Sequence, residues 1–371
     1  MFNKFGKRKL DGQKGIRSRR SIPRVFFLAA FLLALSTSVC FLKRAELATR
    51  SFRSMGTLTT MTLGAAYTGR IDPVTTHVRD IFERLDRELS SYRPDSTISL
   101  LSNKAGVAPV AVSQDTYRVL SLSEHFSAVS DGAFDITVAP LVSLWGFNGA
   151  PVPMSLPSEQ TLCKRLKLVG YRRLVLRDAT AFLPVKGMAV DVGGIAKGYA
   201  VDRAYDYCRS SGIRDFLIDF SGNIRASGRP EWGEKWQIGV RDPFDRTRII
   251  GKIALTSGMA LATSGSYERF VNIAGERFSH IIDPRTGYPV TGTASTTILC
   301  ADATTADALS TASFVVGLGG ARQLLKKVPS AELLIVPDRY PLEIWLTPGF
   351  AKAFTPVPEF AHSIKVLQVR P

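Results

Sequence analysis

The residues whose types and spacing best suit binding or catalysis lie in one stretch, residues 188–204, which reads MAVDVGGIAKGYAVDRA. An apolar run ends in Asp191, and the pair Gly193 and Gly194 follows. An amphipathic segment then begins with Lys197 in its first turn, so the order predicts a strand, a tight glycine turn and a helix. Glycine lets the backbone approach a ligand, and free N–H groups at a helix N-terminus beside a lysine favour phosphate. The stretch therefore predicts a phosphate-binding turn with a carboxylate beside it.

Two familiar nucleotide-binding classes do not fit this stretch. A P-loop ends in Gly-Lys followed by Ser or Thr, and a dinucleotide-binding fold opens with Gly-x-Gly-x-x-Gly. Neither pattern occurs in residues 188–204. The alternative without a ligand is an ordinary glycine turn with a solvated lysine, and the local pattern leaves that alternative open.

A second cluster of oxygen-bearing side chains follows near the C-terminal third of the chain. Asp307, Ser310 and Thr311 stand at positions i, i+3 and i+4 of a predicted helix and therefore share a face. Carboxylate and hydroxyl oxygens suit a hard cation such as Mg²⁺. The alternative is an acid in the first turn of the helix, stabilised by the macrodipole, with Thr304 or Thr305 as the N-cap.

The elements that must position these residues can be located from their periodicity. Apolar residues at helical spacing predict helices over 74–89 and 117–130, and Asp131 to Asp135 reads as a turn. Alternating threonine and apolar residues after residue 57 predict a first strand. Small residues in 262–270 predict a turn. Further strands are predicted over 216–220, 236–240, 248–255 and 278–282, and a strong turn over 283–287.

The net charge of +16 is concentrated at the N-terminus of the 371-residue chain. Residues 1–50 carry twelve Lys and Arg against Asp11 and Glu46, so they account for +10 and the remaining residues for only +6. A nucleic-acid-binding domain needs a clustered basic face, which a weakly basic body does not predict. We therefore expect no nucleic-acid partner.

The N-terminus has the pattern of an export signal. Residues 1–24 are basic, and residues 25–42 form an uncharged, mostly apolar run that ends at Lys43 and Arg44. Such a run is just long enough to span a bilayer. More positive charge precedes it than follows it, which predicts a cytoplasmic N-terminus and an exported body. We expect a protein anchored in the inner membrane with its main domain on the periplasmic side.

The kind of anchor is left open by the residues. Ser36-Thr37-Ser38 has the small-x-small form of a cleavage site, and residues 18–20 partly resemble a twin-arginine signal. Cys40 is a candidate for lipid attachment, but the bulky Val39 precedes it. An uncleaved signal anchor is therefore the first choice.

Cysteine and histidine usage argues against zinc and redox motifs. No Cys-x-x-Cys pair and no Cys/His cluster occurs, and the histidines show no Ser/His/Asp order. We expect the cysteines of the body to be buried as small hydrophobic residues. The cysteines of the body are Cys163, Cys208 and Cys300, and the histidines are His77, His125, His280 and His362.

Seven segments, in this order, resemble the FAD:protein FMN transferase (ApbE) family between about Met55 and Val316. The segments read SMGT, SYRPDSTIS, DGAFDITVAPLVSLWGF, VDVGGIAKGYAVD, TSGSYERF, SHIIDPRTGYP and TTADALSTA. The resemblance implies an α+β fold of the T-fold type, in which helices back antiparallel sheets. It places the FAD-binding transferase domain in residues 50–365.

The resemblance also assigns site residues, position by position. Ser310 stands where some family members have an acid, and one carboxylate fewer weakens a site for a hard cation. Asp307, Asp191 and Lys197 are the candidate catalytic residues. The positions that match the FAD site are Met55, Tyr92, Ala133, Phe134, Asp135, Asp191, Lys197 and Ile281. The positions that match metal ligands are Gly194 through its carbonyl, Asp307, Ser310 and Thr311.

The reaction implied by the resemblance is transfer of FMN from FAD to a threonine of a target protein, with release of AMP and with Mg²⁺ as cofactor. The implied targets are flavin-bearing subunits of sodium-pumping quinone reductase or Rnf-type complexes. Two alternatives remain open: an exported FAD pyrophosphatase, in which water replaces the threonine, and a non-catalytic flavin-binding assembly factor. The residues do not choose between Asp307 and Asp191 as the base.

Overall fold

The computed structural model describes residues 46–149, 152–230 and 234–369. The predicted basic segment 1–24 and the predicted membrane segment 25–42 lie outside the described residues. No helix within the described part of the chain is long and apolar enough to cross a bilayer.

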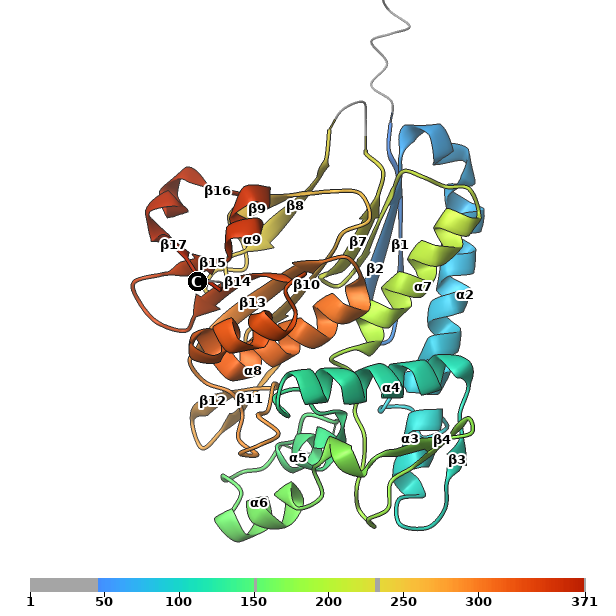
Figure 1. Ribbon diagram of the computed structural model, residues 1–371, viewed down its shortest axis with the longest axis vertical. Coiled ribbons are helices and arrows are strands. Elements are labelled where there is room, and N and C mark those ends of the chain that lie inside the picture. Colours follow the sequence, from blue (N-terminus) through green and yellow to red (C-terminus); the bar gives the residue numbers. More distant parts are fainter. Residues whose placement is uncertain (1–45, 150–151, 231–233, 370–371) are drawn as a thin grey trace, which may run out of the picture. The chain divides into compact units, whose positions relative to one another are not determined.

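A nine-stranded sheet forms the centre of the fold (Figure 1). Its neighbouring strands pair antiparallel except at β15 and β17, which pair parallel. This confirms the predicted antiparallel α+β fold. Within it, β2 confirms a strand after residue 57, but it is not the first strand, because β1 precedes it and pairs with it. In spatial order the strands are β1 (Ala48–Ser54), β2 (Thr57–Leu63), β6 (Phe216–Phe220), β7 (Asn223–Ser227), β10 (Ala260–Gly265), β13 (Thr293–Cys300), β14 (Glu332–Pro337), β15 (Ile344–Leu346) and β17 (Ile364–Val366).

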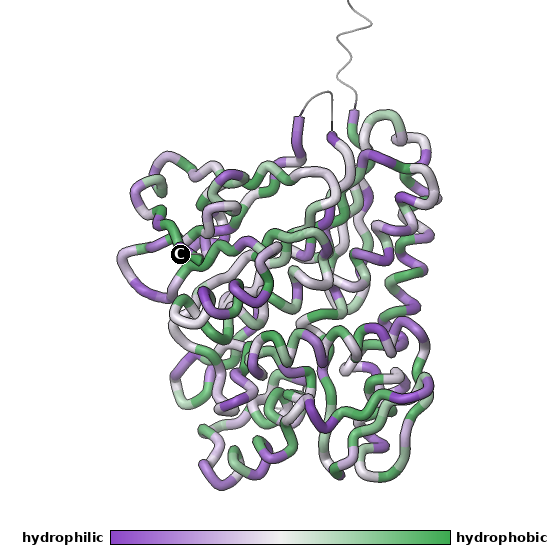
Figure 2. Tube along the Cα trace, viewed as in Figure 1, coloured by the Kyte–Doolittle hydropathy of each residue, from purple (hydrophilic) through white to green (hydrophobic). Residues whose placement is uncertain are grey.

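Three helices cover one face of this sheet: α2 (Ile71–Leu89), α7 (Ala196–Ser210) and α8 (Ala303–Lys327). Their apolar sides join the inward side chains of the central strands in the largest core cluster. Figure 2 shows hydrophilic and hydrophobic residues alternating along α2, as expected for a helix with one solvated side. Gly317, with a φ of 60°, interrupts the helical conformation of α8.

The opposite face of the large sheet packs against a smaller layer. A three-stranded antiparallel sheet and one helix bury a second core cluster there, which includes Trp236, Ile253 and Phe350. The elements of this layer are β8 (Trp236–Arg241), β9 (Ile249–Leu255), β16 (Phe354–Pro356), α9 (Pro348–Ala353) and the 3-10 helix η4 (Pro358–Ser363).

Apart from η1, the remaining elements lie at the lower end of the view in Figure 1, where they adjoin α8 and the start of α7. A small cluster around Leu141, Trp145 and Ile282 joins several of them. The helices are α3 (Thr97–Asn103), α4 (Gln114–Val129), α5 (Ala139–Leu144), α6 (Glu159–Leu166) and the 3-10 helices η2 (Ile136–Val138) and η3 (Tyr171–Arg173). The strands are β3 (Val110–Ala111), β4 (Val175–Arg177), β5 (Thr180–Phe182), β11 (Phe270–Ile273) and β12 (Glu276–Ser279). The 3-10 helix η1 (Ala65–Arg70) lies between β2 and α2.

Three local predictions were wrong. Residues 188–192 are not in a strand, because Asp191 donates its N–H to Ile136 O, at 2.7 Å, outside any ladder. The predicted turn over 262–270 begins as strand β10, because β7 and β13 supply hydrogen-bonding partners on both sides. The N-cap of α8 is Asp302, which accepts from Thr305 N, so Asp307 lies beyond the first turn.

The cysteine prediction is confirmed in part. Cys208 and Cys300 are buried as expected, whereas Cys163 is exposed on α6. All three are free cysteines within the described part of the chain.

Candidate active site

The two predicted clusters meet where the start of α7 crosses α8. Asp307 is buried, and its Oδ2 accepts a hydrogen bond from Gly198 N at 2.9 Å. Its Oδ1 lies 3.8 Å from Lys197 Nζ. Burial raises the pKa of the Asp307 carboxyl, while the positive charge of Lys197 and the Gly198 hydrogen bond oppose that rise. The structure thus pairs a buried carboxylate with a half-buried lysine.

The absence of a side chain at Gly194 allows three segments to approach one another. A Cβ at this position would lie 3.0 Å from Thr311 Oγ1 and 3.1 Å from the ring of Phe134. Both separations are tighter than ordinary contacts, so a larger residue would push the glycine turn away from α8. The structure therefore brings together Gly194, Thr311 and Phe134.

Three hydroxyl groups gather beside Asp307. Ser264 Oγ lies 2.8 Å from Ser310 Oγ and 3.5 Å from Thr311 Oγ1. Ser310 Oγ also donates its single hydroxyl proton to Asp307 O at 2.9 Å, so Ser310 acts as the acceptor in its contact with Ser264. Sequence reasoning missed Ser264, because its segment was read as a turn. The signal was present in TSGSYERF, where Ser264 stands on the strand facing α8.

The N–H groups at the start of α7 are less available than predicted. Ala196 N donates to Val192 O at 2.9 Å, and Gly198 N donates to Asp307. Lys197 Nζ donates to Gly193 O at 2.7 Å. The lysine side chain, rather than a row of free backbone donors, is thus the group here that suits a phosphate.

Asp135 is held by the protein itself. Its Oδ1 accepts from Thr137 N at 2.7 Å and Thr137 Oγ1 at 2.6 Å, and its Oδ2 accepts from Tyr171 N at 2.9 Å. Burial raises the pKa of this carboxyl, and these hydrogen bonds act against that rise. The contacts make Asp135 the cap of η2 and a support for the turn that carries Phe134.

Tyr92 and Asp191 lie near each other at a more exposed edge. Arg269 NH1 donates to Tyr92 Oη at 3.1 Å, and Asp191 Oδ1 accepts from Gly193 N at 2.8 Å. Burial, followed by the negative charge of Asp191, raises the pKa of Tyr92. Although 54 % of Tyr92 is accessible, the guanidinium of Arg269 lies over its ring, 5.9 Å from the centroid.

Two further predicted FAD residues pack together, and a third, Met55, packs against a different apolar cluster. Ala133 and Ile281 belong to one buried cluster with Phe314 of α8. Met55, with a φ of 45°, lies in the turn between β1 and β2 and packs against the main core. The same core cluster includes Phe134, another predicted FAD residue.

His280 is a second residue that the sequence analysis did not select. Its Nδ1 lies 3.0 Å from the carbonyl oxygen of Arg269, which only accepts, so the proton of the neutral ring sits on Nδ1 and leaves Nε2 as an acceptor. Burial, together with the charges of Arg269 and Lys197, lowers the pKa of His280 to about 4. Its place within SHIIDPRTGYP was the available signal.

The lowered pKa of His280 predicts a pH-dependent contribution to stability. Between about pH 6.5 and 4 the unfolded chain takes up a proton at this residue while the folded chain does not, so stability falls as the pH falls. In His280→Asn this loss is absent. We expect the free energy of unfolding of the wild type, minus that of the variant, to fall between pH 7 and pH 5, measured with urea. A constant difference would contradict the lowered pKa.

The fold and the site define an α+β protein with a carboxylate, a lysine and hydroxyl groups between two crossed helices. The model of the ApbE family matches residues 55–335. A Vibrio cholerae protein named FAD:protein FMN transferase is 34% identical over 243 residues, covering 65% of this chain and 73% of that protein. A Haemophilus influenzae protein of the same name is 30% identical over 318 residues, covering 83% and 92%.

The similarity extends to solved structures. The structure titled "Flavin Transferase ApbE from Vibrio cholerae" superposes with a TM-score of 0.73 at 29% sequence identity, and covers 83% of this chain and 99% of that one. The chain belongs to the ApbE family.

Proposed function

We propose that this protein is a Mg²⁺-dependent FAD:protein FMN transferase that modifies a threonine of a target protein. The threonine oxygen attacks the phosphorus of the FMN half of FAD, the bond from that phosphorus to the AMP oxygen breaks, and AMP leaves. The hydroxyl proton passes to a base, and a phosphoester joins FMN to the threonine. The names of the curated relatives support the FAD-to-protein transfer.

The observation that carries the proposal is the buried carboxylate of Asp307 opposite Lys197, with Thr311 and Gly194 alongside. This donor set fits a single Mg²⁺, which prefers few carboxylates and substrate phosphate oxygens. No group of three or more His, Cys, Asp or Glu that could hold a metal occurs among the described residues. In the proposed donor set, Asp307 is the residue that supplies a negative charge to the cation. When bound, Mg²⁺ neutralises charge on the pyrophosphate oxygens.

The protein's own side chains have separate tasks in this proposal. Lys197 binds a phosphate oxygen, which it reaches from the first turn of α7. The ring of Tyr92 stacks on the ligand, and Asp191 beside it orients the ligand or takes the proton. Asp307 and the Nε2 of His280 are the other proton acceptors near Lys197.

The proposal extends to location and partners. Residues 1–24 and 25–42 export and anchor the protein in the inner membrane, with the transferase domain, predicted as residues 50–365, on the periplasmic side. Strands β1 and β17 extend slightly beyond these domain limits, from Ala48 and to Val366. The proposed acceptors are flavin-bearing subunits of quinone reductase or Rnf-type complexes.

The experiment is to incubate the protein with FAD, Mg²⁺ and a candidate acceptor, and to measure the mass of the acceptor. We expect the mass of one FMN to be added at a threonine, with AMP formed in equal amount. AMP without a modified acceptor would indicate a pyrophosphatase. FAD binding without AMP would indicate a non-catalytic flavin-binding factor.

A further inference from the structure

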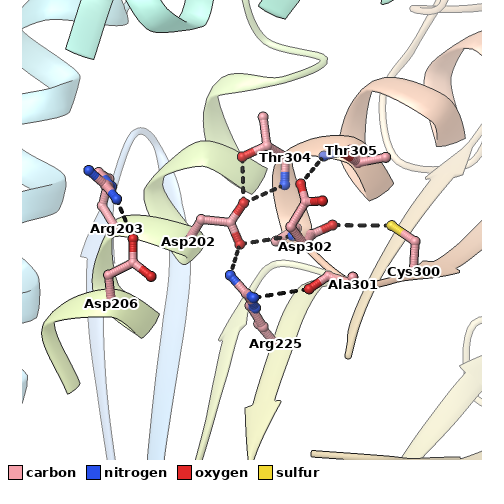
Figure 3. Close-up of polar contacts among 10 residues, drawn as sticks. Asp202, Arg203, Asp206, Arg225, Cys300, Ala301, Asp302, Thr304 and Thr305 are labelled. Atoms are coloured by element: carbon pink, nitrogen blue, oxygen red, sulfur yellow. Dashed lines mark hydrogen bonds and ion pairs between the residues drawn. The ribbon is translucent and has the colours of Figure 1, made fainter. Parts of the chain in front are cut away.

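A second buried carboxylate, outside the residues assigned above, joins α7 to α8. Asp202 of α7 accepts hydrogen bonds from the first residues of α8, as Figure 3 shows. Its Oδ1 accepts from Ala303 N at 2.9 Å, and its Oδ2 accepts from Thr304 N at 2.9 Å and from Thr304 Oγ1 at 2.5 Å. The residue is only 9 % exposed. Asp202 therefore fixes where α8 begins relative to α7.

Arg225 of β7 completes this junction. Its NH1 donates to Asp202 Oδ1 at 2.8 Å, and its NH2 donates to the carbonyl oxygen of Ala301 at 2.9 Å. The guanidinium also lies over the Tyr205 ring, 3.8 Å from its centroid. A buried carboxylate needs an opposite charge and hydrogen-bond donors, and Asp202 has both (Figure 3).

The contact between the helices is reciprocal. Asp202 of α7 accepts from the start of α8, and Asp307 of α8 accepts from Gly198 at the start of α7. Asp202 follows Gly198 by one helical turn, and Asp307 follows Ala303 by one helical turn, so both bonds depend on the same helix register. A shift of either helix along its axis would therefore displace both sets of hydrogen bonds together.

We propose that Asp202, held by Arg225, is a positioning residue that keeps the Asp307 carboxylate opposite Lys197 and thereby sets the affinity of the metal site. The inference rests on the proposed function, because it assigns a cation to Asp307. Residues that orient metal ligands change metal affinity by about 10–100-fold when they are replaced. Asparagine at position 202 keeps the size of the side chain but puts an NH₂ group against the Thr304 N–H or the Arg225 guanidinium.

The test compares Asp202→Asn with Asp206→Asn. Asp206 lies one turn further along the same helix and pairs with Arg203 at the surface, so the control removes the same charge without touching α8 (Figure 3). The probe is Mn²⁺, with free ion followed by electron paramagnetic resonance in the full-length protein with bound FAD. We expect Mn²⁺ to bind about tenfold more weakly to Asp202→Asn and within twofold of wild type to Asp206→Asn.

Thr304→Val provides a milder second variant, because it removes one donor and retains the Asp202 charge. We expect a smaller weakening of Mn²⁺ binding in the same direction. Wild-type Mn²⁺ affinity in folded Asp202→Asn or Thr304→Val, even with a lower urea midpoint, would overturn the inference and leave Asp202 a stabilising residue alone. A wild type that neither binds Mn²⁺ nor transfers FMN would instead refute the proposed function.

Discussion

Replacing Asp307 with asparagine is expected to lower the rate of FMN transfer at least about 100-fold at limiting Mg²⁺, or about 2.7 kcal/mol of transition-state stabilisation. Asparagine retains an oxygen that can accept from Gly198 N, so the crossing of α7 and α8 is preserved. What it removes is the negative charge opposite Lys197. FAD binding, followed by flavin fluorescence, should change much less than the rate. Excess Mg²⁺ should restore part of the activity.

The matched control for this prediction is Asp302→Asn. Asp302 lies on the same helix end and caps α8 through Thr305 N, and asparagine caps a helix as well as aspartate does. Transfer by this control should remain close to wild type. If Asp307→Asn transferred FMN at the wild-type rate in limiting Mg²⁺, the residue would be a structural acid and the metal assignment would be wrong.

Replacing Gly198 with alanine is expected to damage both stability and activity. The added Cβ would lie 2.1 Å from the carbonyl oxygen of Ala303 and 2.8 Å from the Cβ of Asp307. Because one of these neighbours is backbone, α7 and α8 must move apart. Overpacking of this kind costs about 1–3 kcal/mol, and a displacement of about 1 Å at a catalytic group costs about 100-fold in rate. Urea unfolding and the transfer assay measure the two effects.

Gly319→Ala is the control for Gly198→Ala, because it shows whether replacing any helical glycine with alanine would damage the protein. Gly319 lies on α8, and an added Cβ there meets nothing within 4 Å. Alanine is favoured over glycine in a helix by about 1 kcal/mol, so this variant should be as stable as wild type or more stable. Equal behaviour of the two alanine variants would contradict a close crossing of α7 and α8 at Gly198.

Local periodicity was enough to predict the regular elements whose residues alternate clearly. The helix expected over 74–89 is α2, which starts three residues earlier, and the strand expected over 216–220 is β6. The predicted turn after Asp283 is also present. Asp283 Oδ1 accepts a hydrogen bond from Arg285 N, and Asp283 O accepts one from Gly287 N. In each case, the signal lies within a few residues of the element.

Elements whose conformation depends on distant partners were predicted less well. Residues 262–265 are small and polar enough to read as a turn, yet β7 and β13 provide ladders on both sides and make them a strand. Residues 188–192 are apolar enough to read as a strand, yet they lack such a ladder in the described structure. The composition of a segment contains no information about which distant strands will pair with it.

For the site, the sequence by itself determined the chemical groups: a carboxylate and hydroxyls at helical spacing, a glycine turn and a lysine. Only the tertiary structure decided that Lys197 faces Asp307, that Ser264 joins the hydroxyls, and that Asp202 holds the start of α8. The physical reason is separation along the chain. Asp202 and Ala303 are 101 residues apart, and a hydrogen bond between them exists only because the sheet packs α7 against α8.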